Sequence, residues 1–256
     1  VGTLSLNADW IDISGSIVLS GFDSVSFNAG HDIRLADHYY DETDILLWGG
    51  SLETGADMLF NADRLYPTTQ SIFSIVTSGD VATRATVADP SHDPVYSAGG
   101  ILTLEAANIL HMGRWYAPMG QLTLTATAEN GRLYMDSGSV VSVSGQSPVN
   151  YGGFEDEATV GMAIDKTGSS QYPSLEIEAA PATSVVLNAG EVIMRDGATV
   201  DIAGGGEMFG YHFLPGTEGS VNPFDGRYVI VPGMSNALPG QAVYLEGNAA
   251  IDAGVY

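Results

Sequence analysis

Residues 185–206 read VVLNAGEVIMRDGATVDIAGGG, and this stretch decides how the rest of the chain is interpreted. It holds three short alternations of apolar and polar residues, each closed by a small or turn-forming residue. Residues 194–204, MRDGATVDIAG, align without a gap with residues 135–145, MDSGSVVSVSG, at an offset of 59. A pattern that returns in this way indicates a repeating architecture.

A short phrase built around Asn-Ala also recurs along the chain. It occurs as SLNAD at Asn7, SFNAG at Asn28, LFNAD at Asn61 and VLNAG at Asn188, with looser forms TLEAA at Glu105 and TLTAT at Thr125. The separations are 21 from Asn7 to Asn28, 20 from Glu105 to Thr125 and 63, three times 21, from Thr125 to Asn188. This spacing predicts windings of about 20 residues, and the uneven gaps predict insertions.

Within each unit the apolar residues alternate with a period of two, as in Leu4 and Leu6, Ile11 and Ile13, and Ile17 and Leu19. That period is typical of strands. Helical spacing is not sustained, and the 32 glycines would each cost a helix interior about 1 kcal/mol. The chain is therefore expected to be all-β.

A winding with three short strands is the size of one coil of a parallel β-helix, in which each strand pairs with its equivalent in the next coil. The stacked aliphatic residues then form a core, and the equivalent Asn residues form a ladder. About ten coils, at a strand spacing of about 4.8 Å, would give a rod of about 50 Å. A β-sandwich is the alternative, but it does not require a phrase shared at a fixed spacing.

Three segments interrupt the pattern and are expected to be irregular loop excursions from a single β-helical segment that spans residues 1–256. They lie at about 36–97, 146–174 and 210–226. Because the chain starts and ends inside strand-like sequence, we interpret it as a piece of a longer protein. Long connections of this kind are usually functional or flexible, so specificity is expected there.

Charge and composition exclude several kinds of partner and functional site. The formal net charge is -23 with a single lysine, Lys166, so a nucleic-acid partner is not expected. The absence of cysteine excludes disulfides, thiolate metal sites and a cysteine nucleophile. No stretch approaches the roughly 18 consecutive apolar residues of a membrane span, and residues 1–15 lack the pattern of a signal peptide.

Several segments resemble the conserved C-terminal region of filamentous-haemagglutinin-like large exoproteins. These segments are LFNADRLYPTTQSIFSI (59–75), SAGGILTLEAANILHMGRWYAPMGQLTLTA (97–126), GSVVSVSG (138–145), VVLNAGEVIMRDGATVDIAGGGEMFGYHFLPGTEGS (185–220) and YVIVPG (228–233). Their order and spacing carry the resemblance, which covers most of residues 57–233.

The resemblance implies a two-partner-secreted protein of a Gram-negative bacterium. Such a protein is a long right-handed parallel β-helix that an outer-membrane transporter exports, and it is displayed or released as an adhesin. The family has no catalytic motif to carry over. At Gly210, Tyr211 and His212 the sequence departs from the family, which more often has an acidic residue near the histidine position.

Catalysis by a polysaccharide-active β-helix would require two carboxylates about 5 to 9.5 Å apart, at equivalent positions of neighbouring coils. The aligned windings place Asp136 against Arg195 and Asp201 against Ser142, so no carboxylate stack is expected. The sequence also lacks HExxH, GxSxG and a GGxGxD repeat. We therefore assign no catalytic, cofactor-binding or metal-binding residues and expect no enzyme activity.

Other polar residues and the aromatics have structural explanations. Asp12, Asp201 and Asp252 alternate with apolar neighbours and are expected to point outward. The acidic groups at 37–44 and 155–157 are expected to be solvated loops, although the group Asp37, Asp41, Glu42 and Asp44 has the ligand type of calcium. The five histidines, at positions 31, 38, 92, 111 and 212, are scattered and are expected to be structural.

The aromatic residues of the excursions and of the middle of the chain are expected mainly to cover the rod, with sugar or protein contact as the alternative. They are Tyr39, Tyr40, Trp48, Trp115, Tyr116, Tyr151, Phe154, Phe209, Tyr211 and Phe213.

The expected function is that of a shaft segment of a secreted or surface adhesin, which attaches to host or bacterial glycans or proteins through its loops. A polysaccharide-modifying β-helix enzyme is the alternative. Open strand edges at the ends of such a segment also predict end-to-end self-association.

Overall fold

The fold was analysed in a computed structural model, which describes residues 2–42, 45–87, 95, 97–145, 148–156, 159–164, 175–177, 182–211, 244–245 and 254–255. Side-chain surroundings are described for 2–37, 49–87, 95, 97–145 and 182–206. Every regular element in these ranges is a strand, which confirms the all-β prediction. No helix that could cross a membrane is found among them.

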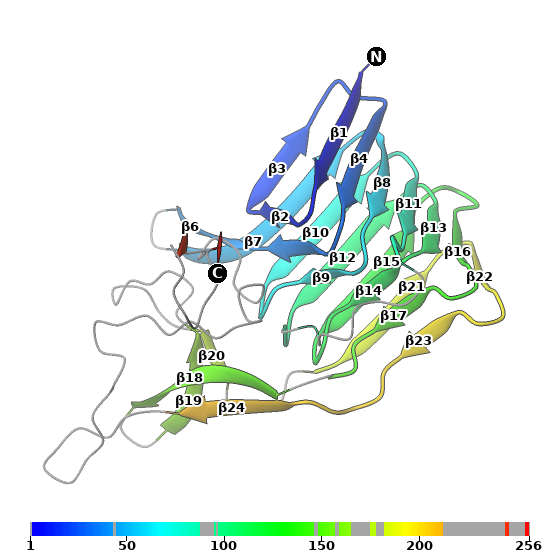
Figure 1. The fold of residues 1–256 in the computed structure, drawn as a ribbon. Helices are drawn as coiled ribbons and strands as arrows, with labels where there is room; N and C mark the ends of the chain where they lie inside the picture. Colours follow the sequence, from blue (N-terminus) through cyan, green and yellow to red (C-terminus); the bar gives the residue numbers. More distant parts are fainter. Residues whose placement is uncertain are drawn as a thin grey trace, which may run out of the picture.

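Three parallel sheets contain most of the strands, and the chain visits them in turn (Figure 1). We name them in the order of the visit. Sheet 1 contains β1 (Thr3–Ala8), β4 (Ser24–Ala29), β8 (Asp57–Asn61), β11 (Val81–Arg84), β13 (Ile109–Met112), β16 (Arg132–Met135) and β22 (Glu191–Met194). Sheet 2 contains β2 (Ile11–Ser14), β5 (Ile33–Ala36), β9 (Leu65–Pro67), β14 (Arg114–Tyr116), β17 (Val140–Ser142) and β23 (Thr199–Asp201). Sheet 3 contains β3 (Ser16–Leu19), β7 (Ile45–Thr54), β10 (Ile72–Thr77), β12 (Ile101–Ala106), β15 (Gln121–Ala126) and β21 (Ser184–Asn188).

The remaining strands lie outside these three sheets. β6 (His38–Glu42) pairs antiparallel with β7. A separate four-stranded sheet joins β18 (Pro148–Asp156), β19 (Thr159–Ile164), β20 (Leu175–Ile177) and β24 (Glu207–Tyr211). The short strands β25 (Tyr244–Leu245) and β26 (Gly254–Val255) pair with each other.

Equivalent residues of successive windings are partners in the parallel sheets, an arrangement compatible with a parallel β-helix. Asn7 pairs with Asn28, and Asn28 with Asn61. The Asn28 amide donates to Oδ1 of Asn7 at 3.1 Å, and the Asn61 amide donates to Oδ1 of Asn28 at 2.6 Å. The predicted asparagine ladder is therefore confirmed for these three residues.

The other three copies of the Asn-Ala phrase lie on a different sheet. Glu105, Thr125 and Asn188 are partners along β12, β15 and β21 of sheet 3, whereas the first three copies lie on sheet 1. Thr125 pairs directly with Asn188, so their separation of 63 is one winding with an insertion. The interpretation of 63 as three windings was wrong, because the same phrase ends strands on two sheets.

The alignment at an offset of 59 is confirmed. Val140 pairs with Thr199, and Ser142 pairs with Asp201. The turns before these strands also match, since Gly138 and Gly197 have φ of 80° and 84°. Because these angles favour glycine, the Asp/Ser-Gly turn of this phrase has a backbone reason to recur.

The structure differs from the predicted excursions in part. Residues 57–84, inside the expected first excursion, form the regular strands β8 to β11. Departures from the winding there are the β6–β7 hairpin and the connection from β11 to β12. The second excursion, 146–174, coincides with β18 and β19 of the separate sheet. Most of the third, residues 212–226, lies outside the described residues.

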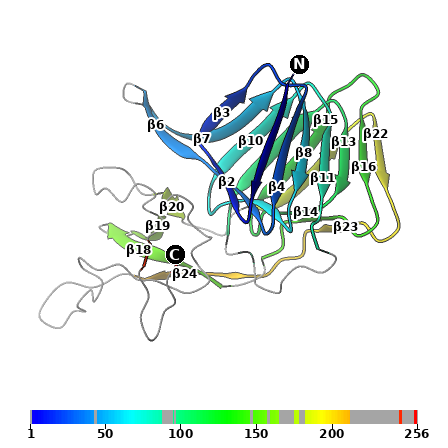
Figure 2. The ribbon, with the colours of Figure 1, turned by 45° about the horizontal axis from the view of Figure 1, so that its top comes forward.

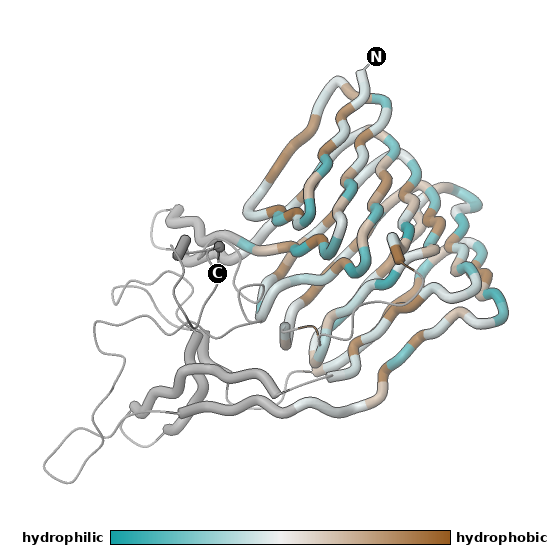
Figure 3. Tube along the Cα trace, in the orientation of Figure 1, coloured by the Kyte–Doolittle hydropathy of each residue, from teal (hydrophilic) through white to brown (hydrophobic). Residues whose placement is uncertain are grey.

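The core is a set of columns that run through the windings (Figure 3). In β4, β12 and β15 the burial alternates strictly, so every second side chain points inward. Phe27 and Phe60 are partners in one inward column of sheet 1, with parallel rings at 5.2 Å, and Trp115 of sheet 2 meets the Phe60 ring edge-on at 6.4 Å. The prediction that Trp115 covers the rod was wrong, since it is 1% exposed and lies in the core.

Seven strands in sheet 1 set the height of the stack. At about 4.8 Å per strand, six intervals give about 29 Å. The described residues form fewer windings than the predicted ten coils and 50 Å, because the β6–β7 hairpin, the β11–β12 connection and the segment between β17 and β21 occupy residues that a uniform spacing counts as windings. Figure 2 shows the strands of each sheet side by side along this axis.

The first winding exposes apolar side chains whose equivalents in the inner windings are buried. Leu6 pairs with Phe27, which is 3% exposed, but Leu6 itself is 37% exposed. At the other end, Val192 and Met194 are 42% and 49% exposed, whereas their partners Leu133 and Met135 are fully buried. Both end windings therefore present apolar side chains that inner windings bury.

We expect the chain to associate as its concentration rises, because pairing of an end winding buries this apolar surface and satisfies its strand edge. Leu6→Lys should weaken the association by placing a charge in the contact. Val76→Lys, at an outward position that is 36% exposed in the middle of the stack, is the matched control. Sedimentation equilibrium measures the effect, and a monomer at all concentrations would contradict it.

Candidate functional site

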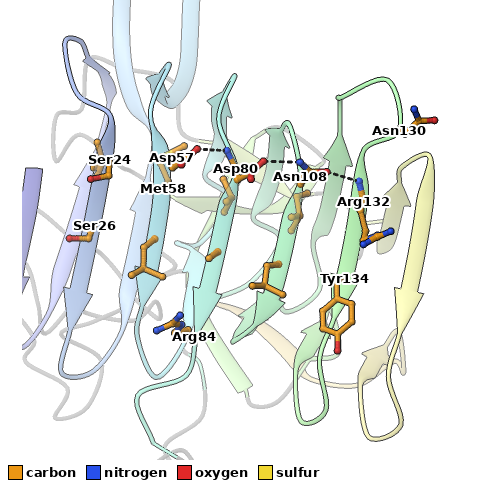
Figure 4. A pocket seen from close by; sticks show the side chains of 16 residues that line it. Ser24, Ser26, Asp57, Met58, Asp80, Arg84, Asn108, Asn130, Arg132 and Tyr134 are labelled. Atoms are coloured by element: carbon orange, nitrogen blue, oxygen red, sulfur yellow. Dashed lines mark hydrogen bonds between the residues drawn. The ribbon is translucent and has the colours of Figure 1, made fainter. Parts of the chain in front are cut away.

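A shallow groove of about 950 Å³ crosses the outer face of sheet 1 (Figure 4). We call it the sheet-1 groove. It runs across strands β4, β8, β11, β13 and β16, so its length follows the stack axis rather than a single strand. Because side chains alternate along a strand, residues two apart form its parallel rows.

The first row lies at the beginning of the strands and contains Asp57, Asp80, Asn108 and Arg132. Oδ1 of Asp57 accepts a hydrogen bond from the Asp80 backbone N–H at 2.8 Å. Oδ1 of Asp80 accepts from the Asn108 amide at 2.8 Å, and Oδ1 of Asn108 accepts from the Arg132 backbone N–H at 3.0 Å. Each winding thus holds the polar side chain of the preceding one in place, as the dashed lines of Figure 4 show.

The middle row is mostly apolar and contains Leu59, Ala82, Leu110 and Tyr134, which are partners across successive strands. Leu110 is 39% exposed. The Tyr134 hydroxyl donates to Oδ1 of Asp136 at 3.3 Å. This row forms an apolar strip beside the polar row.

Arg84 lies on the side of the strip away from Asp80 (Figure 4). Its side chain is exposed, and no carboxylate among the described residues forms a salt bridge with it. Arg132, in contrast, is paired with Glu191 at 2.7 Å. The groove therefore offers hydrogen-bond acceptors along one side and an available guanidinium on the other.

The expectation that no carboxylates stack was wrong for this surface. Asp57 and Asp80 occupy equivalent positions of adjacent windings, next to the partners Met58 and Val81. Sequence comparison missed the row because its members are 23, 28 and 24 residues apart, since the turns and insertions between windings differ in length. The sequence feature that could have revealed this row is the polar residue at the start of each alternating strand.

A second polar cluster lies along sheet 2 and is largely buried. Arg34 pairs with Asp12, Arg64 with Asp32 at 2.7 Å, and Arg114 with Asp63 at 3.1 Å. In each pair the arginine comes from a later winding than the aspartate. The last two pairs have all side chains less than 10% exposed.

Neighbouring groups shift the pKa values in this cluster. Burial acts to lower the pKa of Arg64, but its hydrogen bonds to Asp32 and the charge of Asp32 outweigh burial and raise it. Burial raises the pKa of Tyr66, and the Asp32 charge adds to the effect. Arg64 therefore stays charged and Tyr66 stays protonated at neutral pH.

Two described residues of the connection from β11 to β12, Val87 and Val95, lie against this cluster. Val95 packs against Tyr66 and Tyr116, and the Val87 carbonyl accepts from Arg114 at 3.0 Å. Tyr116 is 9% exposed. The prediction that the aromatic residues mainly cover the rod under the loops holds for Tyr116.

His111 is a fully buried titratable group on the inner side of sheet 1. Its Nε2 lies 2.9 Å from the Val140 carbonyl, so Nε2 carries the proton. Its Nδ1 then accepts from the Thr83 hydroxyl at 2.7 Å, and Oγ1 of Thr83 accepts from the Gly113 N–H at 3.2 Å. Burial lowers the pKa of His111 to about 4, against the opposing effect of the Val140 hydrogen bond.

The remaining predicted polar residues have partners or lie outside the description. Asp37 was expected in a solvated loop, but it is buried and accepts from the Ser71 hydroxyl and from the Ile72 N–H, both at 3.2 Å. His31 stacks on Trp10 at 5.0 Å. Asp12 and Asp201 lie on the outer row of sheet 2, as expected. No group of metal-ligating side chains occurs in the described ranges.

Other residues singled out from the sequence lie where no side chain is described. These are Tyr39, Tyr40, Asp41, Glu42, Asp44, Trp48, His38, His92, Tyr151, Phe154, residues 155–157, Phe209, Tyr211, His212, Phe213 and Asp252.

No family model, no curated protein and no solved structure matches this chain.

We expect the stability of the fold to fall as the pH drops from 6.5 to about 4, in part because of His111. The unfolded residue titrates near 6.5, so in this window the unfolded chain takes up a proton that the folded chain does not. The contribution is about 3 kcal/mol. Urea unfolding of wild type and His111→Gln at pH 7.5 and 4.5 measures it. Equal losses in both proteins would contradict it.

Breaking the Asp32–Arg64 pair should be far more costly than breaking an exposed pair. Asp32→Asn leaves a buried guanidinium without its counter-charge and should destabilise the fold by about 3 to 5 kcal/mol. The matched control is Glu191→Gln, whose pair with Arg132 is more than half exposed and should change stability by less than about 1 kcal/mol. Urea unfolding at neutral pH compares the two, and similar losses would contradict the assignment.

Proposed function

We propose that the chain is a shaft segment of a secreted Gram-negative adhesin of the filamentous-haemagglutinin-like kind, and that its windings form a right-handed parallel β-helix. The main support is the column of aligned windings, with partners such as Asn7, Asn28 and Asn61 at equivalent positions. Such a column extends by adding windings, each of which buries apolar surface on the last. A right-handed path is what parallel crossover connections adopt almost without exception.

The proposed partners follow from the same assignment. An outer-membrane transporter of the two-partner type would export the chain to the cell surface or the medium. There it would attach to a glycan or protein on a host or bacterial cell, through its loops and aromatic residues. The net charge of -23 disfavours nucleic acid as a partner.

The alternative is a polysaccharide-modifying β-helix enzyme, and one observation favours it. Asp57 and Asp80 stack in an open groove that also contains Arg84 and Arg132. Against this, one oxygen of each carboxylate already accepts a hydrogen bond from the next winding. Those bonds explain both residues as parts of the strand-start ladder, so we rank the adhesin first.

The adhesin proposal predicts that beads coated with the chain attach to epithelial or bacterial cells more than albumin-coated beads do. Beads carrying the heat-unfolded chain are the control for nonspecific adsorption. Attachment no greater than with albumin would contradict the proposal.

The enzyme alternative predicts instead that soluble sugar is released from polysaccharide, and that Asp57→Asn and Asp80→Asn abolish the release.

A further inference from the structure

We infer that the sheet-1 groove binds a neutral glycan chain that lies along the stack axis, from β8 to β16. This inference rests on the proposed adhesive function and names its binding site and ligand class. It places recognition on the regular face of the stack, whereas the proposed function uses loops and aromatic residues.

The groove is built before a ligand arrives. The ladder of Asp57, Asp80 and Asn108 fixes each side chain by a hydrogen bond of 2.8 to 3.0 Å to the next winding. Ordering these side chains therefore costs little on binding. Oδ2 of both aspartates accepts no hydrogen bond from the described residues, so it can accept one from a ligand hydroxyl.

A sugar polymer matches the three kinds of surface in the groove. Its hydroxyls can donate to Asp57 and Asp80 and accept from Arg84, which has no salt-bridge partner among the described residues. Its C–H faces can pack on the exposed Leu110 and on the Tyr134 ring. The three intervals of about 4.8 Å between β8, β11, β13 and β16 give a track of about 14 Å, room for a short oligosaccharide.

Other ligand classes fit less well. An added peptide strand needs a free sheet edge, but β8, β11 and β13 are each paired on both sides. A nucleic acid or a sulfated or sialylated glycan would meet two carboxylates in the groove against the guanidinium of Arg84, since Arg132 is paired with Glu191, and a net charge of -23 on the chain. Electrical neutrality of the ligand is therefore part of the inference.

The test is an array of neutral, sialylated and sulfated glycans, followed by calorimetric titration of the best neutral oligosaccharide. We expect wild type to bind neutral glycans and Leu110→Lys to weaken that binding at least about tenfold. The matched control is Val76→Lys on the outer face of sheet 3, which starts at 36% exposure against 39% for Leu110 and should bind like wild type. Equal urea unfolding midpoints verify that both variants fold.

Three results would overturn the inference. They are undiminished binding by Leu110→Lys, preference for sialylated or sulfated glycans, and no glycan binding by wild type. If coated beads still attach to cells in any of these cases, the adhesive function stands and only the groove is excluded. If neither beads attach nor glycans bind, both proposals fail.

Discussion

The structure depends on parallel register between successive windings. Because a parallel sheet brings equivalent residues to about 4.8 Å from one another, each residue lies against its own counterpart in the next winding. Inside, this stacks Leu, Ile, Val and Phe into the core. On the outside, it aligns Asn7 with Asn28 and Asn61, whose side-chain amides hydrogen-bond to one another. A charged residue placed inside would break a whole column, so the alternation must be kept in every winding.

The fourth winding departs from this pattern because it has no strand in sheet 2 among the described residues. Polar residues beside this gap form hydrogen bonds with one another. Within the described residues this winding contributes β11 to sheet 1 and β12 to sheet 3 but no strand to sheet 2, where β9 pairs directly with β14. Thr83 and His111 replace apolar residues in the inner column beside this point. They satisfy each other, the Gly113 N–H and the Val140 carbonyl, so no buried polar group of this set lacks a partner.

The two polar clusters differ in how far their side chains are buried. On sheet 2 the pairs Asp32–Arg64 and Asp63–Arg114 are buried, and the Val87 carbonyl accepts from Arg114. On sheet 1 the hydrogen-bonded row of Asp57, Asp80 and Asn108 stays open to solvent beside an apolar strip. Similar side chains therefore serve stability on one face and are available for binding on the other.

The sequence alone determined the all-β class, the parallel register of Asn7 with Asn28 and the offset of 59 between Val140 and Thr199, because period-two alternation and turn glycines are local properties. It did not determine that Asn28 and Asn188 lie on different sheets, that residues 57–84 are regular windings, or that Asp57 and Asp80 stack. Those facts depend on which strands pair across insertions of unequal length. Strand pairing joins residues that are far apart in the sequence, so only the tertiary structure determines it.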